Sequence, residues 1–499
     1  MKRLFSLTPL TLALVLAGCS SIPDLQQPAL DVPAAFKEAS IDATHDASSD
    51  AAPLVAADGT RWQPARPADA QPRGRWWLAF NDPALTALID EATAGSPNLQ
   101  VAAARVRQAR SLAGLAEADR APQVGAEVGA QRSRPSALAL GLPEGARVGP
   151  GRAYQARLSA SYELDLFGRV DAGVTAARLD ADSALASYQS VLLSLQADVA
   201  QTYFRLRAID AELDTLRRTV QLREQSVKIN QSRFDNGDIG EFDLSRARVE
   251  LATARADALG AGRERADAEH ALAVLLGKPA SNFTLAANPL LDAALPSIPA
   301  GLPSSLLERR PDVAAAQRAM RAANARIGVA RAAMYPSLSL NGALGTETGS
   351  TGNLFNWSAR SWVLGALLSM PIIDGGRNRA NIARSEAFLE ESVGAYRQSV
   401  LSAFADVEDN LAGLRILAGQ RGEIDSAVVA ARRSTDLAQK LYDAGRSSYL
   451  DLLDAQRNLA AVERSAVQLR GSQAITTVAL IRALGGAWGD APAEKVAAR

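Results

Sequence analysis

Four stretches of the chain alternate between apolar and polar residues with a period of two. They run over Val124–Ala130, Tyr154–Leu164, Leu338–Leu344 and Trp362–Met370. This period is typical of β-strands that have one apolar and one polar face. The members of each pair are connected by a segment rich in Gly, Ser, Pro or Asn, which predicts a loop. We therefore expect two β-hairpins, within the ranges 121–165 and 336–373.

Each predicted hairpin leads into a long stretch without proline, 169–233 or 377–441. At 1.5 Å per residue, a helix of about 65 residues is about 100 Å long. Both stretches are followed by a glycine, Gly237 or Gly445, as expected of a helix C-cap. Return helices are expected at 241–276 and 448–484, and a Ser448-x-x-Asp451 capping box opens the second.

A further helix should precede the first hairpin. It is expected to begin at Asp82, an N-cap before Pro83, and to run unbroken to about Arg120, where Pro122 ends it. Residues 20–75 are rich in Ala, Pro, Asp and Ser and lack periodicity. They predict an extended segment that lies along the surface.

The second half of the chain repeats the first. Phe234-Asp-Asn-Gly237 recurs as Tyr442-Asp-Ala-Gly445, and the offset is 442 − 234 = 208. Asn98-Leu99 recurs as Asp312-Val313 at an offset of 214. These periods are too long for a solenoid and indicate a duplicated half-molecule. The expected divisions are a signal peptide at 1–18, a lipidated extended segment at 19–81, the two repeats at 82–295 and 296–488, and a tail at 489–499.

The N-terminus has the pattern of a secretion signal. Lys2 and Arg3 precede an apolar run over residues 4–16, which is too short for a transmembrane helix. The following Leu16-Ala-Gly-Cys19 resembles a bacterial lipobox, so cleavage before Cys19 and lipidation of Cys19 are expected. A plain signal peptide is the alternative. Ser20 resembles the residue found in lipoproteins that are sent on to the outer membrane.

Composition narrows the function further. The 499 residues include 54 basic and 54 acidic side chains, which gives no argument for a nucleic-acid partner. After the N-terminal signal, no segment has about 20 uninterrupted apolar residues. His45 lies in the N-terminal segment and His270 within a predicted helix, so the sequence does not indicate a cluster of catalytic residues. We expect no enzyme activity, no metal and no cofactor other than the covalent lipid.

The four strands suit a membrane. Strands of about 10 residues match a tilted bilayer crossing, but four of them cannot close a barrel, which needs about eight. Because an open sheet edge is not tolerated in lipid, copies of the chain must pool their strands, and three copies would give 3 × 4 = 12. A soluble half-buried sheet is the alternative. The candidates are Glu127, Gln155, Arg157, Ser159 and Glu163 for a polar lumen, and Tyr154, Tyr162, Trp357 and Trp362 for an aromatic girdle.

Five motifs are distributed over the mature chain. They are Trp76-Trp-Leu-Ala-Phe80, Arg309-Arg-Pro-Asp-Val313, Tyr335-Pro-Ser-Leu338, Pro371-Ile-Ile-Asp-Gly-Gly-Arg377 and Tyr449-Leu-Asp-Leu-Leu-Asp-Ala-Gln456. Together they resemble the outer membrane efflux proteins of the TolC/OprM class, in the lipoprotein branch called NodT-type. The resemblance implies a mainly α-helical homotrimer. Its membrane part would be a 12-stranded β-barrel with four strands per chain, continued by a long periplasmic α-helical barrel.

The resemblance also implies partners and a gate. The partners would be a periplasmic adaptor protein, an inner-membrane efflux pump and outer membrane lipid. The hairpin turns would form the periplasmic entrance, with Asp451 and Asp454 as rings of carboxylates and Leu450 as an apolar constriction. Carboxylates so close to one axis favour cation uptake or raised pKa values, and they would select the entering ion by the sign of its charge. A solvated helix start is the alternative for both carboxylates.

In this family, polar contacts between the hairpins latch the closed end. Tyr442 and Asp243 occupy matching positions and are a candidate latch. An arginine that contributes in one branch of the family is replaced here by Ser447. Arg446, the adjacent residue, is the remaining cationic candidate.

The predicted function is a passive outer membrane conduit that exports small molecules as part of a tripartite efflux system. The alternatives are a conduit of a protein-secretion system and a lipid-anchored periplasmic scaffold without a pore. The alternating strands favour a conduit, because a scaffold has no use for four amphipathic crossings. The lipobox and Trp76-Trp77 favour efflux by resemblance.

Overall fold

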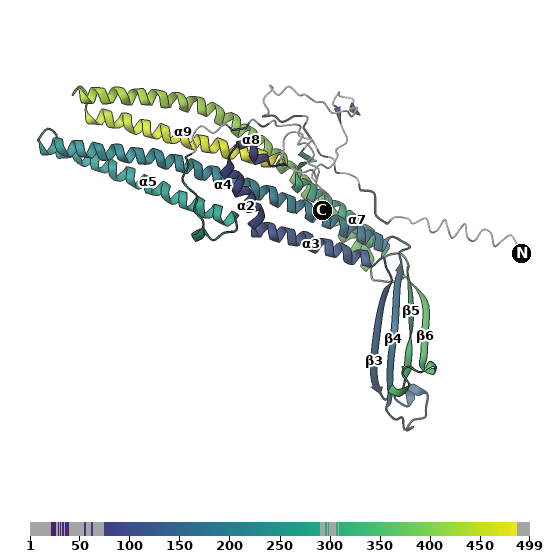
Figure 1. The fold of residues 1–499 in the computed structure, drawn as a ribbon. Coiled ribbons are helices and arrows are strands. Elements are labelled where there is room, and N and C mark those ends of the chain that lie inside the picture. Colours follow the sequence, from purple (N-terminus) through teal and green to yellow (C-terminus); the bar gives the residue numbers. More distant parts are fainter. Residues whose placement is uncertain are drawn as a thin grey trace. The chain divides into compact units, whose positions relative to one another are not determined.

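The computed structural model describes residues 74–289 and 309–486 continuously (Figure 1). It also describes parts of 21–38 and 295–307 and the short strands β1 (Leu54–Val55) and β2 (Arg61–Trp62). The predicted signal peptide, Cys19 and the tail lie outside the described residues. The chain divides into two compact units. Unit 1 comprises residues 1–29, 105–185 and 315–397, and unit 2 comprises residues 30–104, 186–314 and 398–499.

Unit 1 contains a four-stranded antiparallel sheet in the order β3-β4-β5-β6 (Figure 1). Its strands are β3 (Gln123–Ser133), β4 (Gly151–Leu164), β5 (Ser337–Thr348) and β6 (Arg360–Ser369). Both predicted hairpins are confirmed, and β4 pairs with β5, so the two repeats share one sheet. Short 3₁₀ turns occur in the connecting loops at η2 (Leu138–Leu140), η4 (Thr351–Asn353) and η5 (Trp357–Ala359).

The strand register places the apolar positions on one face of the sheet. Leu158 on β4 lies opposite Leu344 on β5, and Leu344 lies opposite Trp362 on β6. The other face carries Glu127 opposite Arg157, with 3.1 Å between the carboxylate oxygen and the guanidinium Nε. In the single chain the apolar face is exposed, as at Val128, Leu158, Leu344, Trp362 and Leu364.

The helices follow the sequence repeat. The two hairpins of long helices are α4 (Arg169–Asp235) with α5 (Glu241–Leu275), and α8 (Arg377–Asp443) with α9 (Tyr449–Ala483). Their first residues are related by 377 − 169 = 208 and 449 − 241 = 208. The helices before the strands, α3 (Pro97–Ala118) and α7 (Pro311–Ala332), are related by 311 − 97 = 214. The duplication inferred from the sequence is therefore present in the fold.

The unbroken helix predicted from Asp82 to Arg120 is wrong. The structure has two helices there, α2 (Pro83–Gly95) and α3, separated at Ser96. Ser96 is extended, with φ −65° and ψ 122°, because the ring of Pro97 disfavours the helical conformation of the residue before it. The start was predicted correctly, since the Asp82 carboxylate accepts hydrogen bonds from the amides of Ala84 and Leu85.

Aromatic and aliphatic side chains form the main core of unit 2. Trp76 and Trp77, on the 3₁₀ turn η1 (Trp76–Phe80), pack edge to face with centroids 5.7 Å apart. The Tyr203 hydroxyl donates to the Asp82 carboxylate at 2.6 Å, which connects α4 to the start of α2. Another 3₁₀ turn, η3 (Ala280–Asn282), follows α5. Within the described part of the chain, no helix is both long enough and apolar enough to cross a membrane.

The described parts of the N-terminal segment lie against helices, as predicted. In unit 1 the Asn324 side chain donates to the Pro23 carbonyl at 2.7 Å. In unit 2 the amides of Lys37 and Glu38 donate to the Glu408 carboxylate at 2.7 and 3.0 Å. Phe36 is buried in a cluster with Leu306, Val407, Leu480, Ala483 and Leu484.

Candidate functional site

The two helical hairpins of unit 2 end in turns of the same backbone geometry. Gly237 lies between α4 and α5 with φ +81°, and Gly445 lies between α8 and α9 with φ +68°. In each turn the amide after the glycine donates a 2.8 Å hydrogen bond to a carbonyl five residues earlier. A left-handed φ favours glycine, so the repeated glycine that the sequence shows has a conformational cause.

The helices that leave these turns begin differently. α5 begins after Gly240, which has no side-chain cap, whereas Ser448 caps α9. The Ser448 hydroxyl accepts from the Asp451 amide at 3.2 Å, and the Asp451 carboxylate accepts from the Ser448 amide at 3.0 Å. The predicted capping box is therefore confirmed. The hydrogen bonds from Ser448 hold the pKa of the exposed Asp451 carboxyl below its ordinary range.

The predicted gate residues lie on the first turns of α9, away from the core. Leu450 is 39% exposed, while Leu452 and Leu453 are buried. Asp454 is exposed, with a carboxylate oxygen 3.6 Å from the Arg457 guanidinium on the same helix. A single chain supplies each carboxylate once, so a ring of carboxylates would need three chains. The gate role of Leu450, Asp451 and Asp454 stays a prediction.

In the single chain Tyr442 contacts Arg233, and the latch predicted from Tyr442, Asp243 and Arg446 stays a prediction. The Arg233 guanidinium donates to the Tyr442 hydroxyl at 2.6 Å and lies 5.3 Å from the centre of its ring. The contact connects α4 to α8 and therefore joins the two hairpins. Asp243 is half-buried in the first turn of α5. Arg446 is exposed and forms no ion pair with any residue that the structure describes.

Further polar contacts join the hairpins, and two of them lie near the turns. The Arg223 side chain is 3% exposed and donates to the Gln456 amide oxygen at 2.6 Å. Burial lowers the pKa of Arg223. Glu250 on α5 accepts two hydrogen bonds from the Arg457 guanidinium on α9, which lower the pKa of Glu250. With Arg233–Tyr442, these pairs are called the inter-hairpin contacts below.

Sequence reasoning missed Arg223, Arg233, Glu250 and Arg457. The repeat itself carried a signal for all four. At an offset of 208, Arg223 corresponds to Ala431, Arg233 to Leu441, Glu250 to Asn458 and Arg457 to Val249. A charge present in only one repeat marks a position where the two copies have diverged, and here those positions lie between the hairpins.

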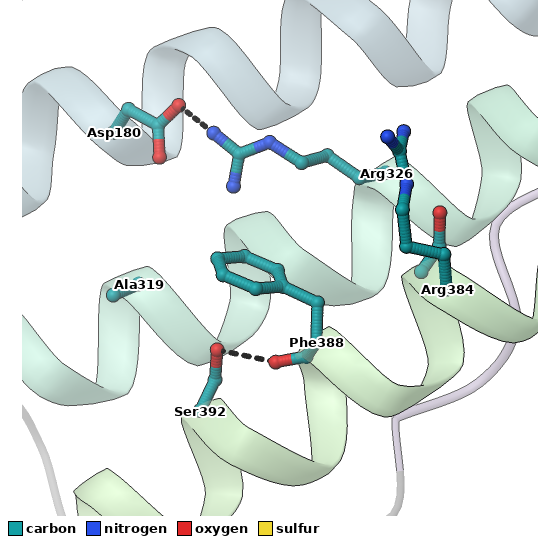
Figure 2. Close-up of a pocket in the computed structure, with 7 residues that line it drawn as sticks. Asp180, Ala319, Arg326, Arg384, Phe388 and Ser392 are labelled. Carbon is teal, nitrogen blue, oxygen red and sulfur yellow. Dashed lines mark hydrogen bonds and ion pairs between the residues drawn. The ribbon is translucent and has the colours of Figure 1, made fainter. Parts of the chain in front are cut away.

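A cavity of about 440 Å³ lies in unit 1 between α4, α7 and α8 (Figure 2). Asp180 forms an ion pair with Arg326, and the Arg326 guanidinium lies 5.9 Å from the centre of the Phe388 ring. Burial raises the pKa of Asp180. The Ser392 hydroxyl donates a hydrogen bond to the Phe388 carbonyl at 2.8 Å, within the same helix. The cavity contains no nucleophile beside a base.

No group of three or more His, Cys, Asp or Glu residues that could hold a metal ion occurs among the described residues. Near the hairpin turns, Asp451 is engaged with Ser448, and Glu250 and Asp454 are engaged with Arg457. The arrangement can hold two hairpins together, and it can present carboxylates at the start of α9.

Comparison with known proteins identifies relatives over nearly the whole chain. The family model of the outer membrane efflux protein matches residues 88–278 and 302–486. The solvent efflux pump outer membrane protein SrpC of Pseudomonas putida is 33% identical over 495 residues, which are 97% of this chain and 98% of SrpC. The cation efflux system protein CusC of Escherichia coli is 33% identical over 97% of this chain and 98% of CusC.

Solved structures agree with the sequence relatives. The open state of the MtrE outer membrane channel of Neisseria gonorrhoeae matches with a TM-score of 0.78 and 30% identity, over 94% of this chain and 98% of MtrE. The Campylobacter jejuni CmeC outer membrane channel has a TM-score of 0.84 at 24% identity, over 94% and 95% of the two chains, which concerns the fold alone.

These comparisons confirm the predicted fold class, a barrel of strands continued by a helical barrel, and the predicted location in the outer membrane. Proteins of this kind form trimers and act in tripartite efflux systems, as channels rather than as enzymes. The chain belongs to the outer membrane efflux protein family.

Proposed function

We propose that this chain is a passive trimeric conduit whose hairpin turns form a gate held shut by the inter-hairpin contacts. The buried Arg223–Gln456 contact carries this proposal. Separating the hairpins there breaks a hydrogen bond made by a charged group, and the net contribution of such a bond is about 1.5–3 kcal/mol. Such a cost makes the joined state the resting one. Opening would then need a partner that supplies this free energy, and a periplasmic adaptor with an inner-membrane pump is the partner proposed.

In the trimer, Asp451 and Asp454 would supply three carboxylates each around the entrance. An aspartate carboxyl is ionised at neutral pH, and the hydrogen bonds from Ser448 lower the pKa of Asp451 further, so the ring would attract cations. Leu450 would narrow the same passage. This assignment makes the entrance selective by the sign of the charge, and it leaves selection among small molecules to the pump.

The test is conductance of the purified trimer in a planar bilayer, with wild type beside Asp451→Ala/Asp454→Ala. The matched control is Asp214→Ala/Asp425→Ala, which removes two exposed carboxylates from the long helices. Cation-preferring channels that lose this preference only in the first variant would support the proposal. An equal preference for cations in both variants would show that Asp451 and Asp454 do not form the selective entrance. If trimers are shown to be inserted and neither wild type nor any variant conducts, a scaffold without a pore would be favoured.

We also propose that Cys19 carries the lipid anchor. Its position after Leu16-Ala-Gly supports this assignment. Mass spectrometry of the mature protein should find the chain beginning at an acylated Cys19, and Cys19→Ser should abolish the added mass. A mature chain that begins elsewhere, or an unmodified Cys19, would contradict it.

A further inference from the structure

Three arginines lie at one end of the apolar face of the sheet. Arg132 and Arg152 are register partners on β3 and β4, two residues beyond the partners Ala130 and Tyr154. Side chains two residues apart in a strand point to the same face, so both arginines continue the apolar face. Arg360 on β6 is two residues before Trp362 and lies on this face as well. Arg132, Arg152 and Arg360 are called the arginine band below.

The band lies where the hairpin loops begin, at the end of the sheet away from the helices of unit 1 (Figure 1). In outer membrane barrels this end, with the longer loops, is the extracellular one. The loops 134–150 and 349–359 also carry exposed apolar side chains at this end, Leu138, Phe355 and Trp357 among them. The arginines therefore mark the outer boundary of the lipid-facing surface.

None of the three arginines has an acidic partner among the residues that the structure describes. Arg132 and Arg152 lie directly opposite each other, and like charges in this position destabilise a sheet. Glu347 is paired in register with Gln155 and so points to the polar face. Glu144, in the first loop, forms no ion pair with them. Residues 132–152 and 347–360 together hold five arginines and two glutamates, a net charge of 5 − 2 = +3 per chain.

The helix end of unit 1 differs in this respect. Arg120 forms ion pairs with Glu117, at 3.2 Å, and with Asp171. Arg169 donates to both carboxylate oxygens of Glu163, at 2.8 and 2.6 Å. Arg120 and Arg169, near the helix end of the strands, are thus neutralised within the chain, whereas the arginine band at the other end has no acidic partner. The missing counter-charge at the outer end is best supplied by a ligand.

We propose that the arginine band binds the phosphate groups of a phosphorylated glycolipid in the outer leaflet. The inference rests on the outer membrane location established above. Guanidinium groups bind phosphate through two parallel hydrogen bonds, and their aliphatic stems can lie along the apolar face beside the acyl chains. One phosphate between Arg132 and Arg152 would also remove their mutual repulsion. In a trimer the outer rim would carry 3 × 3 = +9 from these segments.

The experiment measures binding of a diphosphorylated glycolipid to the purified trimer by native mass spectrometry, beside the same glycolipid with its phosphates removed. Wild type should prefer the phosphorylated form. Arg132→Gln/Arg152→Gln should weaken that preference by roughly fivefold for each arginine removed. The matched control is Arg157→Gln, a change of the same kind on the polar face of β4, which should keep the full preference.

Several outcomes would overturn the proposal. It fails if the double variant forms trimers and keeps the wild-type preference for the phosphorylated glycolipid. It also fails if Arg157→Gln reduces this preference as much as the double variant does. Inorganic phosphate that competes as well as the glycolipid does would point to a simple anion site and contradict a lipid ligand. If the double variant does not assemble, Arg152→Gln alone is compared with Arg157→Gln by the same criterion. Channels in a bilayer of neutral lipid test the conduit independently.

Discussion

The two helical hairpins of unit 2 share a backbone but differ in their packing. Both pairs have helices of 67 and 35 residues and turn at a left-handed glycine. In α4, buried side chains continue as far as Arg223 and Asn230. In α8, Ala431 is the only buried side chain after Val407, and Val429 is 69% exposed. The first hairpin is therefore covered within its own chain, whereas α8 presents an open face, consistent with a family that forms trimers.

This difference teaches how a duplicated chain can make a gate. Two identical hairpins would present the same side chains at every interface between hairpins. No one interface would then be favoured to open before another. Here the contacts between the hairpins use Arg223, Arg233 and Glu250 of the first repeat and Arg457 of the second, and the other repeat has a different residue at each equivalent position. The backbone stayed equivalent while the side chains between the copies became complementary.

Removal of the buried inter-hairpin contact should have the largest effect on the gate. Gln456→Ala leaves the Arg223 guanidinium buried without its partner, which destabilises the joined hairpins by about 1.5–3 kcal/mol. Open probability in a planar bilayer should rise by about 10- to 100-fold. Arg432→Gln is the control, because its contact with Glu463 at 2.9 Å lies within the second hairpin. An equal increase in the control would refute a specific role for the inter-hairpin contact.

The two turn glycines should respond alike if the backbones are equivalent. Gly237→Ala and Gly445→Ala each place a Cβ in a left-handed conformation, at a cost of about 1–2 kcal/mol. Hydrogen exchange of the adjoining helix ends should accelerate to a similar degree in both variants. Gly260→Ala is the control, since Gly260 lies within α5 with an ordinary helical φ and with nothing within 4 Å of an added Cβ. A large effect at one turn and none at the other would show that the turns are not equivalent.

Acid should weaken the joined hairpins through Glu250. Its pKa is lowered in the folded chain by Arg457, so this contact contributes stability above the ordinary glutamate pKa of about 4.3. The contribution is lost as the pH falls through the lower folded pKa. Open probability should then rise by up to about fivefold, the effect of an ion pair whose arginine is half-exposed. Glu250→Gln should show the raised value at neutral pH and no further step of this kind in acid.

The smallest effects concern the helix starts, where the two hairpins already differ. Ser448→Ala removes the cap of α9 and should cost about 1 kcal/mol. Gly240→Ser creates the same Ser-x-x-Asp box ahead of Asp243 and should stabilise α5 by a few tenths of a kcal/mol. Denaturant unfolding measures both changes. If Ser448→Ala left the free energy of unfolding unchanged, capping would not explain the difference between the two helix starts.

Periodicity alone predicted the strands, the long helices and the turns, because alternation and glycine act locally. The break at Ser96 was missed, since apolar residues keep a helical spacing on both sides, as at Leu88, Ala92 and Leu99. Tyr442 was recognised as a contact residue, but its partner Arg233 was not. That contact spans 209 residues of sequence and depends on how two helices face each other. Local patterns do not contain this information.

The two offsets between the repeats also have a practical consequence. The helices before the strands are related by 214 residues and the long helices by 208, so the second copy is six residues shorter between them. The loop 134–150 has 17 residues and the loop 349–359 has 11, which accounts for the difference of 17 − 11 = 6. Length has thus varied at the outer loops and not at the helical turns. Epitope tags or fluorescent labels should be inserted in loop 134–150, where the chain has already accommodated extra residues.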